Sequence, residues 1–255
     1  MINQSWQLQA PLDAIIFDCD GTLSAIEGID ELALIHQVGD IVQRLTAEAM
    51  GKTGMTLDIY RERLQIVRPT LAQTLAIGER YIQQQVPDAQ DLITILQRLN
   101  KPIYIVSAGL QPAVTVFGEF LKVPVQHIFA VDVQYDQQGN YVDFDHASPM
   151  TRKNGKREIV DHIKKMRPRT AYIGDGLSDY EVYDLVTRFI GFGGAYYRQQ
   201  IEARCDFYLK CLSMAALVPL LLTEEEQAKL NSIEKQLLQR GLNSIQQKEV
   251  SIRAR

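Results

Sequence analysis

The sequence predicts an α/β protein with a doubly wound parallel sheet, an inserted helical cap domain and a C-terminal helical tail. Three short apolar segments, each leading into a polar residue, have the length and composition of buried strands. Helical segments separate them, which favours parallel strands joined by right-handed crossovers. The 255 residues suffice for one such sheet with an insertion.

The predicted strands end in side chains that could form a site. They run into polar residues as follows: residues 14–17 into Asp18, residues 103–106 into Ser107, and residues 171–173 into Gly174 and Asp175. Helical patterns over residues 88–99 and 156–165 supply connecting helices. Ligands of open α/β sheets bind beyond the carboxyl ends of the strands, so we expect the polar side chains to meet there.

The segment between the first two predicted strands is too long for a simple crossover. Helical patterns run over residues 30–49 and 57–67, and Thr70 and Gln73 form a capping box that begins another helix. We therefore expect an inserted helical domain. The predicted division is a core of residues 1–26 and 86–222, a cap of residues 27–85 and an extension of residues 223–255.

A small hairpin is predicted in the second half of the chain. Residues 128–133 and 141–144 are strand-like and flank a turn that contains Gly139 and Asn140. We expect this hairpin at an edge of the fold.

The C-terminal extension has the pattern of a narrow amphipathic helix. Thr223 and Glu226 form a capping box at its start. The apolar stripe that follows ends at Gly241 and consists of Leu230, Ile233 and Leu237. We expect a helix that packs loosely on the core or, alternatively, joins two copies of the chain.

Composition excludes several classes of protein. The charge is 27 − 31 = −4 with neutral histidines, so there is no basic excess for binding nucleic acid. The longest apolar run, residues 214–222, is far shorter than the roughly 20 residues that span a bilayer. Cys19, Cys205 and Cys211 are too few and too scattered for a disulfide framework. Residues 1–11 lack the pattern of a signal peptide, so we expect a cytoplasmic protein without membrane or nucleic-acid partners.

Asp18 and Asp20 lie two residues apart, where the first predicted strand gives way to a glycine turn. An Asp-x-Asp-Gly-Thr string arises by chance in well under about one in a hundred chains of this size. A single aspartate at a strand end commonly caps backbone amides, whereas two followed by further acids indicate a functional site.

Two more acids follow the third predicted strand. Asp175 lies directly after it, and Asp179 lies four residues further on. Four carboxylates in one cleft cannot all stay ionised without a cation. An all-oxygen ligand set without paired His or Cys favours a hard ion, so Mg²⁺ is the expected cofactor.

Carboxylates, Mg²⁺, a strand-end serine and a lysine together indicate transfer of a phosphoryl group to a carboxylate. We expect Asp18 to attack phosphorus and form an aspartyl-phosphate. Ser107 would supply a hydroxyl to the phosphate, and Lys156, with Lys153 as a fallback, would offset its charge. Asp20 would protonate the leaving oxygen and then act as base on the attacking water.

In this order the residues resemble the four motifs of the haloacid dehalogenase superfamily. The matching positions are Asp18 with Asp20, then Ser107, then Lys156, then Asp175 with Asp179. The resemblance implies a Rossmann-like core in which Asp18, the main-chain carbonyl of Asp20 and Asp175 bind Mg²⁺. Asp179 would support the metal site.

More narrowly, the chain resembles the phosphoserine phosphatases in three longer strings: EGIDELA from Glu27, RERL from Arg61 and IGFGGAYYRQQ from Ile190. This resemblance implies that Glu27 meets the substrate ammonium, that Arg63 meets its carboxylate and that Met50 also contacts the substrate. It also implies that Ala108 and Gly109 help to bind phosphate. A guanidinium fork matches a carboxylate in a bidentate pair, so the role of Arg63 is physically sensible.

Three positions depart from that family's usual pattern. Ala108 replaces a glycine, which keeps the amide donor but adds a methyl group. Thr56, beside Met55, stands where an aromatic lid residue is common. Val131 and Asp132 replace an Asn-Arg pair, which removes a cation near the site.

The expected protein is a Mg²⁺-dependent phosphomonoesterase that hydrolyses O-phospho-L-serine, as a monomer or a homodimer. One alternative is a phosphatase or phosphotransferase for another small amine or metabolite phosphate. A second is a sensor of a phosphorylated ligand without turnover, although sensing would not need the acid/base Asp20.

Overall fold

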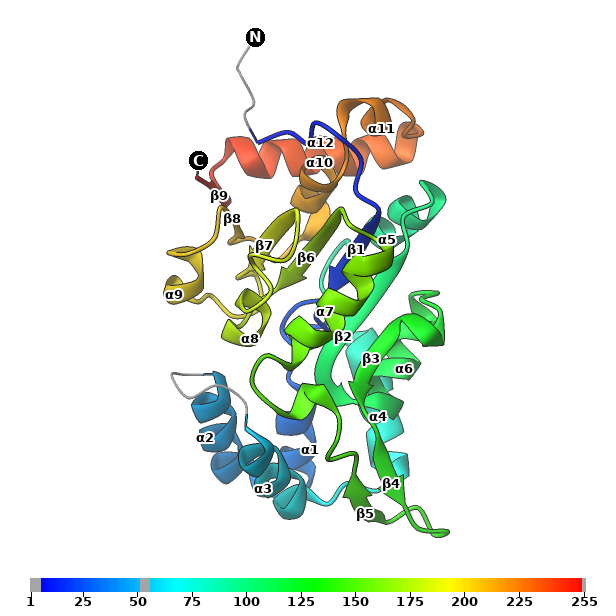
Figure 1. The fold of residues 1–255 in the computed structure, drawn as a ribbon, viewed down its shortest axis with the longest axis vertical. Helices are drawn as coiled ribbons and strands as arrows, with labels where there is room; N and C mark the ends of the chain where they lie inside the picture. Colours follow the sequence, from blue (N-terminus) through cyan, green and yellow to red (C-terminus); the bar gives the residue numbers. More distant parts are fainter. Residues whose placement is uncertain (1–5, 51–55, 254–255) are drawn as a thin grey trace.

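The computed structural model describes residues 6–50 and 56–253, without the side chains of residues 48–50. A seven-stranded sheet in the order β3-β2-β1-β6-β7-β8-β9 forms the centre, and a group of helices lies beyond one end of it (Figure 1). Strands β3 to β8 of this order are parallel, and β9 at the edge is antiparallel. The predicted α/β fold with a largely parallel sheet is confirmed.

Strand β1 occupies the middle of the sheet and is completely buried. Its last residue, Phe17, is level with Ile105 of β2 and Ile173 of β6. The residues just beyond these positions therefore lie side by side at one edge of the sheet; Ser107 lies inside β2, which is longer than the predicted strand. The strands are β1 Ala14–Phe17, β2 Ile103–Leu110, β3 Ile128–Val131, β6 Thr170–Gly174, β7 Arg188–Phe192, β8 Phe207–Leu209 and β9 Val250–Ile252.

Helices connect and cover the strands. They are α5 Ala89–Arg98, α6 Gln111–Phe120, α7 Gly155–Met166, α8 Leu177–Tyr180, α9 Gln199–Glu202 and α10 Leu217–Leu221, with 3₁₀ turns at Val125–His127, Pro149–Thr151 and Met214–Ala216. Helix α7 carries strongly segregated apolar and polar faces, and its apolar Val160 and Ile163 are buried.

The insert between β1 and β2 begins with four helices, α1 Gly28–Ile35, α2 Gly39–Met50, α3 Leu57–Val67 and α4 Leu71–Gln83. Both parts of the capping box of Thr70 and Gln73 are present at the start of α4. Helix α4 packs along α6 of the sheet region. Gly78 permits this close packing, because a Cβ there would lie 2.5 Å from Cβ of Val116.

The predicted hairpin is displaced toward the C-terminus. Residues 128–131 form β3 of the main sheet, and the hairpin consists of β4 Val133–Tyr135 and β5 Tyr141–Phe144. The prediction of one strand over residues 128–133 is wrong, because the apolar residues before and after the exposed Asp132 belong to two different sheets.

The C-terminal extension is helical and also adds a strand. Helix α11, Glu224–Ala228, begins with the predicted capping box, and α12, Ser232–Gln246, follows. The helix continues beyond Gly241, where the predicted apolar stripe ends. Gly241 lies inside α12, where a Cβ would be only 2.2 Å from the Ala215 carbonyl oxygen. No helix in the described part of the chain is long and apolar enough to span a membrane.

Candidate active site

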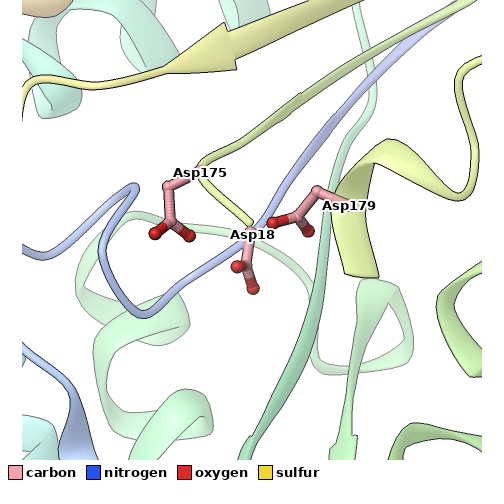
Figure 2. Close-up of side chains that lie close together, drawn as sticks. All are labelled: Asp18, Asp175 and Asp179. Carbon is pink, nitrogen blue, oxygen red and sulfur yellow. The ribbon is translucent and has the colours of Figure 1, made fainter. Parts of the chain in front are cut away.

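Three aspartate side chains meet at the carboxyl ends of β1 and β6. Asp18 follows β1, Asp175 follows β6, and Asp179 lies in the short helix α8 (Figure 2). One carboxylate oxygen from each lies within 4.8 Å of the others, and all three residues are buried. Like charges this close in a buried place repel one another, so the cluster is suited to holding a cation.

Lys156 supplies a positive charge to this cluster from the start of α7. Its Nζ lies 2.9 Å from Asp18 Oδ1 and 2.6 Å from Asp179 Oδ1. Burial alone would lower the pKa of Lys156, but the charges of Asp179 and Asp18 raise it above its ordinary value. The ammonium is therefore a fixed cation beside the predicted nucleophile, whereas the fallback residue Lys153 is exposed.

The two acids that end β1 and β6 have raised pKa values. Burial, and then repulsion by Asp179, raises the pKa of Asp18 well above its ordinary value. The same two causes raise the pKa of Asp175 to about 6, although Arg198 opposes the shift. Asp175 Oδ1 is buried and has no hydrogen-bond partner among the described residues. A buried, unsatisfied carboxylate oxygen beside two further acids fits a hard divalent ion such as Mg²⁺.

Asp20 is surrounded by hydrogen-bond donors of its own. Its Oδ1 accepts hydrogen bonds from the Gly28 N–H and the Tyr81 hydroxyl, both at 2.6 Å. Its Oδ2 accepts a hydrogen bond from the Ser107 hydroxyl at 3.2 Å. Asp18 and Asp20 thus have different surroundings, as two carboxylates with different chemical roles require.

Ser107 and its neighbours form the third side of the site. The Gly109 N–H donates to Ser107 Oγ at 2.9 Å, and the carbonyl of Ala108 accepts a hydrogen bond from the Tyr60 hydroxyl at 3.1 Å. A Cβ on Gly109 would lie 2.9 Å from Asp20 Oδ2, so glycine allows this segment to approach the acid. The Ser107 hydroxyl and the segment that contains Gly109 thus lie beside Asp20.

A cavity of about 60 Å³ joins the helical insert to this sheet edge. Its polar lining includes Asp20, Glu27 and Arg63, and its apolar wall consists of Ile29, Leu32, Tyr60, Leu64, Ile77, Tyr81, Leu110 and Ala113. The remaining lining residues, Gly28, Ala108 and Gly109, present little more than backbone. Two ionisable groups of the insert, Glu27 and Arg63, thus line the same cavity as the predicted acid/base Asp20.

Glu27 and Arg63 are both strongly desolvated. Burial, and then the charges of Asp20 and Asp175, raise the pKa of Glu27 well above its ordinary value, and Glu27 Oε1 has no hydrogen-bond partner among the described residues. Burial lowers the pKa of Arg63, whose Nη1 donates to Thr46 Oγ1 at 3.4 Å. Burial raises the free energy of the ionised form of both side chains. Each is therefore suited to bind a ligand group of opposite charge.

Among the other predicted positions, Met50 and Met55 cannot be compared with the structure, whereas Thr56 can. The side chain of Met50 lies outside the described residues, as does Met55. Thr56 is the N-cap of α3, and its hydroxyl accepts the Ile59 N–H. Tyr60, one turn further along α3, contributes an aromatic ring to the cavity lining, as does Tyr81 of α4.

Sequence reasoning missed three residues that contact the predicted acids. Arg198 pairs with Asp175, Tyr81 donates to Asp20, and Tyr172 donates to Asp179 Oδ1 at 2.7 Å. Only Arg198 had a signal in the sequence, because it lies in the IGFGGAYYRQQ string. The two tyrosines reach the acids through tertiary packing, which no local pattern encodes.

Known proteins resemble this chain in sequence and in fold. The description haloacid dehalogenase-like hydrolase fits residues 15–183. Human phosphoserine phosphatase is 31% identical over 199 residues, which are 77% of this chain and 88% of the human protein. Phosphoserine phosphatase from Methanocaldococcus jannaschii is 27% identical over 176 residues, 66% of this chain and 80% of that protein.

Solved structures share the fold. A phosphoserine phosphohydrolase-like protein from Francisella tularensis superposes with a TM-score of 0.74 at 23% identity, covering 83% of this chain and 100% of that one. A phospho-aspartyl intermediate analogue of phosphoserine phosphatase gives a TM-score of 0.70 at 22% identity, covering 82% and 98%. The expected resemblance is confirmed, and the chain belongs to the haloacid dehalogenase-like hydrolases.

Proposed function

We propose that the protein is a Mg²⁺-dependent phosphatase that hydrolyses O-phospho-L-serine to L-serine and phosphate. The observation that carries this proposal is the shared cavity, which Glu27 and Arg63 line together with Asp20. An acid and a guanidinium are the groups that the ammonium and carboxylate of an amino acid would pair with. Relatives named phosphoserine phosphatase support the same substrate.

In the proposed first step, the Asp18 carboxylate attacks phosphorus and the ester P–O bond breaks. Lys156, which contacts Asp18 Oδ1, would offset the charge of the phosphate oxygens. The Ser107 hydroxyl and the N–H groups of Ala108 and Gly109 would orient the phosphate. Asp20 would protonate the departing serine oxygen and then accept a proton from the water that hydrolyses the aspartyl-phosphate.

The carboxylate cluster fits a divalent ion. Asp18, Asp175 and the main-chain carbonyl of Asp20 would hold Mg²⁺, and Asp179 would support that site while it orients Lys156. When bound, the ion would supply positive charge that stabilises the phosphate in the transition state. The unsatisfied Asp175 Oδ1 supports this assignment.

We also propose how the chain is divided around the site. Residues 27–85 would act as a cap over a core of residues 1–26 and 86–222, and closure of the cap would exclude water from the phosphorylation step. We expect the enzyme to work in the cytoplasm on a small phosphomonoester, as a monomer or a homodimer.

Release of inorganic phosphate from a panel of phosphomonoesters, with Mg²⁺ or with EDTA, tests the proposal. We expect phosphoserine to have the highest kcat/KM among phosphoserine, phosphothreonine, phosphoethanolamine and a sugar phosphate, and EDTA to abolish the activity. A preference for phosphoethanolamine would contradict the role of Arg63. Binding of phosphoserine without phosphate release would indicate a sensor, and transfer to an added alcohol would indicate a phosphotransferase.

A further inference from the structure

Tyr81, near the end of α4, is fixed against the predicted acid/base. Its side chain is 1% exposed, and its ring packs against Phe117 of α6 at a centroid distance of 5.9 Å. Its hydroxyl donates to Asp20 Oδ1 at 2.6 Å. A short hydrogen bond from a fully packed ring holds the carboxylate in a defined orientation.

Gly28 makes this contact possible. Its N–H donates to the same oxygen, Asp20 Oδ1, at 2.6 Å. A Cβ at this position would lie only 2.1 Å from the Tyr81 hydroxyl, so a larger residue would displace the tyrosine. Asp20 Oδ1 therefore has two donors, one from the start of α1 and one from the end of α4.

The other oxygen of the same carboxylate lies beside two of the predicted phosphate-binding residues. Asp20 Oδ2 accepts a longer hydrogen bond, 3.2 Å, from the Ser107 hydroxyl, and it lies against Gly109. Ser107 would turn to the phosphate when substrate binds, which would leave Oδ2 as the less constrained oxygen. The two oxygens of Asp20 are thus unequal.

We propose that Tyr81 is a positioning residue that anchors Asp20 through Oδ1, so that Oδ2 carries the proton in both halves of the reaction. This inference rests on the proposed phosphatase function. In the first half, Asp20 Oδ2–H gives its proton to the ester oxygen as the P–O bond to the alcohol breaks and the bond to Asp18 forms. In the second half, Oδ2 takes a proton from water as the water oxygen bonds to phosphorus and the Asp18–phosphorus bond breaks.

Two esters with different leaving groups test the role of Tyr81. An alkoxide such as serine's needs a proton to leave, whereas 4-nitrophenolate does not. The ratio kcat/KM reports only the steps up to alcohol release, so the second half of the reaction does not enter. We expect Tyr81→Phe to lower kcat/KM for phosphoserine by about 10- to 100-fold with little change in KM, and to lower kcat/KM for 4-nitrophenyl phosphate by less than about 3-fold.

Tyr60→Phe is the matched control. Tyr60 also lines the cavity, but its hydroxyl donates to the Ala108 carbonyl. Its loss should affect the two esters equally. Thermal unfolding of both variants with and without Mg²⁺ would show whether they remain folded.

Equal losses with both esters in Tyr81→Phe would overturn the inference, because a general loss of structure does not depend on the leaving group. A wild-type protein that hydrolyses phosphoethanolamine but not phosphoserine would instead refute the proposed substrate. The Tyr81 comparison would then be made with phosphoethanolamine as the alkyl ester, so the two failures are distinguishable.

Discussion

Arg198 holds its guanidinium against the buried Asp175, with Nη2 at 2.9 Å and Nε at 3.1 Å from Asp175 Oδ2. Both donors use the same carboxylate oxygen, and Asp175 Oδ1 stays buried without a hydrogen-bond partner among the described residues. Arg198 therefore orients Asp175 through Oδ2 and partly offsets its charge. A contact of this kind typically tunes a metal ligand from outside the metal's own shell.

Loss of this contact should weaken metal binding. We expect Arg198→Ala to raise the Mg²⁺ concentration for half-maximal activity by about 10- to 100-fold. Titration of activity with Mg²⁺, and calorimetry on the protein without substrate, would measure the shift. Arg152→Ala is the control, because Arg152 pairs with Glu158 at an exposed site and its loss should leave the Mg²⁺ dependence unchanged. An unchanged Mg²⁺ dependence in Arg198→Ala would show that Arg198 does not orient a metal ligand.

The raised pKa values predict how Mg²⁺ stabilisation depends on pH. Burial raises the pKa of Asp175 to about 6, and it raises those of Asp18 and Glu27 as well. Without metal, the folded protein then binds more protons than the unfolded chain above pH ~4, so these groups reduce stability as pH rises toward and through their folded pKa values. Mg²⁺ held by the ionised Asp18 and Asp175 would remove their share of this cost.

We therefore expect the rise in melting temperature caused by Mg²⁺ to grow between about pH 5 and pH 7. Differential scanning fluorimetry in MgCl₂ and in EDTA at each pH would measure it. Taking the difference at each pH cancels the contributions of surface groups that do not sense the metal. A difference that is constant over this range would mean that the clustered acids do not bind the ion.

Asp18 should be essential for turnover but not for folding. Asp18→Asn removes the proposed nucleophile and is expected to lower kcat by on the order of 10⁴-fold or more. The substitution also removes a buried charge whose pKa is raised by burial, so the melting temperature in EDTA should be unchanged or higher. Phosphate release and thermal unfolding would be measured on the same preparation. Substantial residual turnover would assign the nucleophile elsewhere.

Arg63 should favour substrates that carry a carboxylate over those that lack one. Arg63→Ala is expected to raise KM for phosphoserine by about 10- to 100-fold, the cost of losing a charge-assisted hydrogen bond. Phosphoethanolamine lacks the carboxylate, so its KM should change far less. Steady-state kinetics with both esters would decide, and equal changes would remove Arg63 from substrate recognition.

The sequence could predict the sheet edge because it depends on local signals. Apolar strands followed by Asp18, Ser107 and Asp175 are visible in the chain, and parallel pairing then brings them together. The side chains that contact these residues are distant from them in the sequence. Tyr81 and Arg198 lie more than 20 residues from the acids they contact, and no local pattern says which acid either of them reaches.

The errors in the predicted fold have a similar origin. Gly241 normally indicates the end of a helix, but here it lets α12 approach the Ala215 carbonyl, a tertiary contact that overrides its low helix propensity. Strand β9 is three residues long and exists only because β8 offers an edge with which it can pair. The hairpin was displaced because one apolar run supplies β3 and then β4.

A buried ion pair at the amino ends of the strands, away from the candidate active site, should add to the free energy of unfolding without affecting catalysis. Lys101, just before β2, lies 2.6 Å from Glu226 of α11, and its Nζ also donates to the Leu12 carbonyl at 3.0 Å. The side chains are 3% and 10% exposed, so Lys101→Met would leave Glu226 charged with little water around it. We expect a loss of about 3 kcal/mol in the free energy of unfolding.

The double variant Lys101→Met/Glu226→Gln tests whether the unpaired charge of Glu226 causes the loss of stability. Glutamine keeps an oxygen for the capping hydrogen bond from the Thr223 N–H, which Glu226 now accepts at 3.0 Å, but it carries no charge. Urea denaturation should therefore show most of the lost stability restored in the double variant. Activity toward phosphoserine should not change in either variant, because Lys101 precedes β2 while Ser107 lies near its carboxyl end. A double variant that is as unstable as Lys101→Met would show instead that the lysine stabilises the chain mainly through its packing and its bond to Leu12.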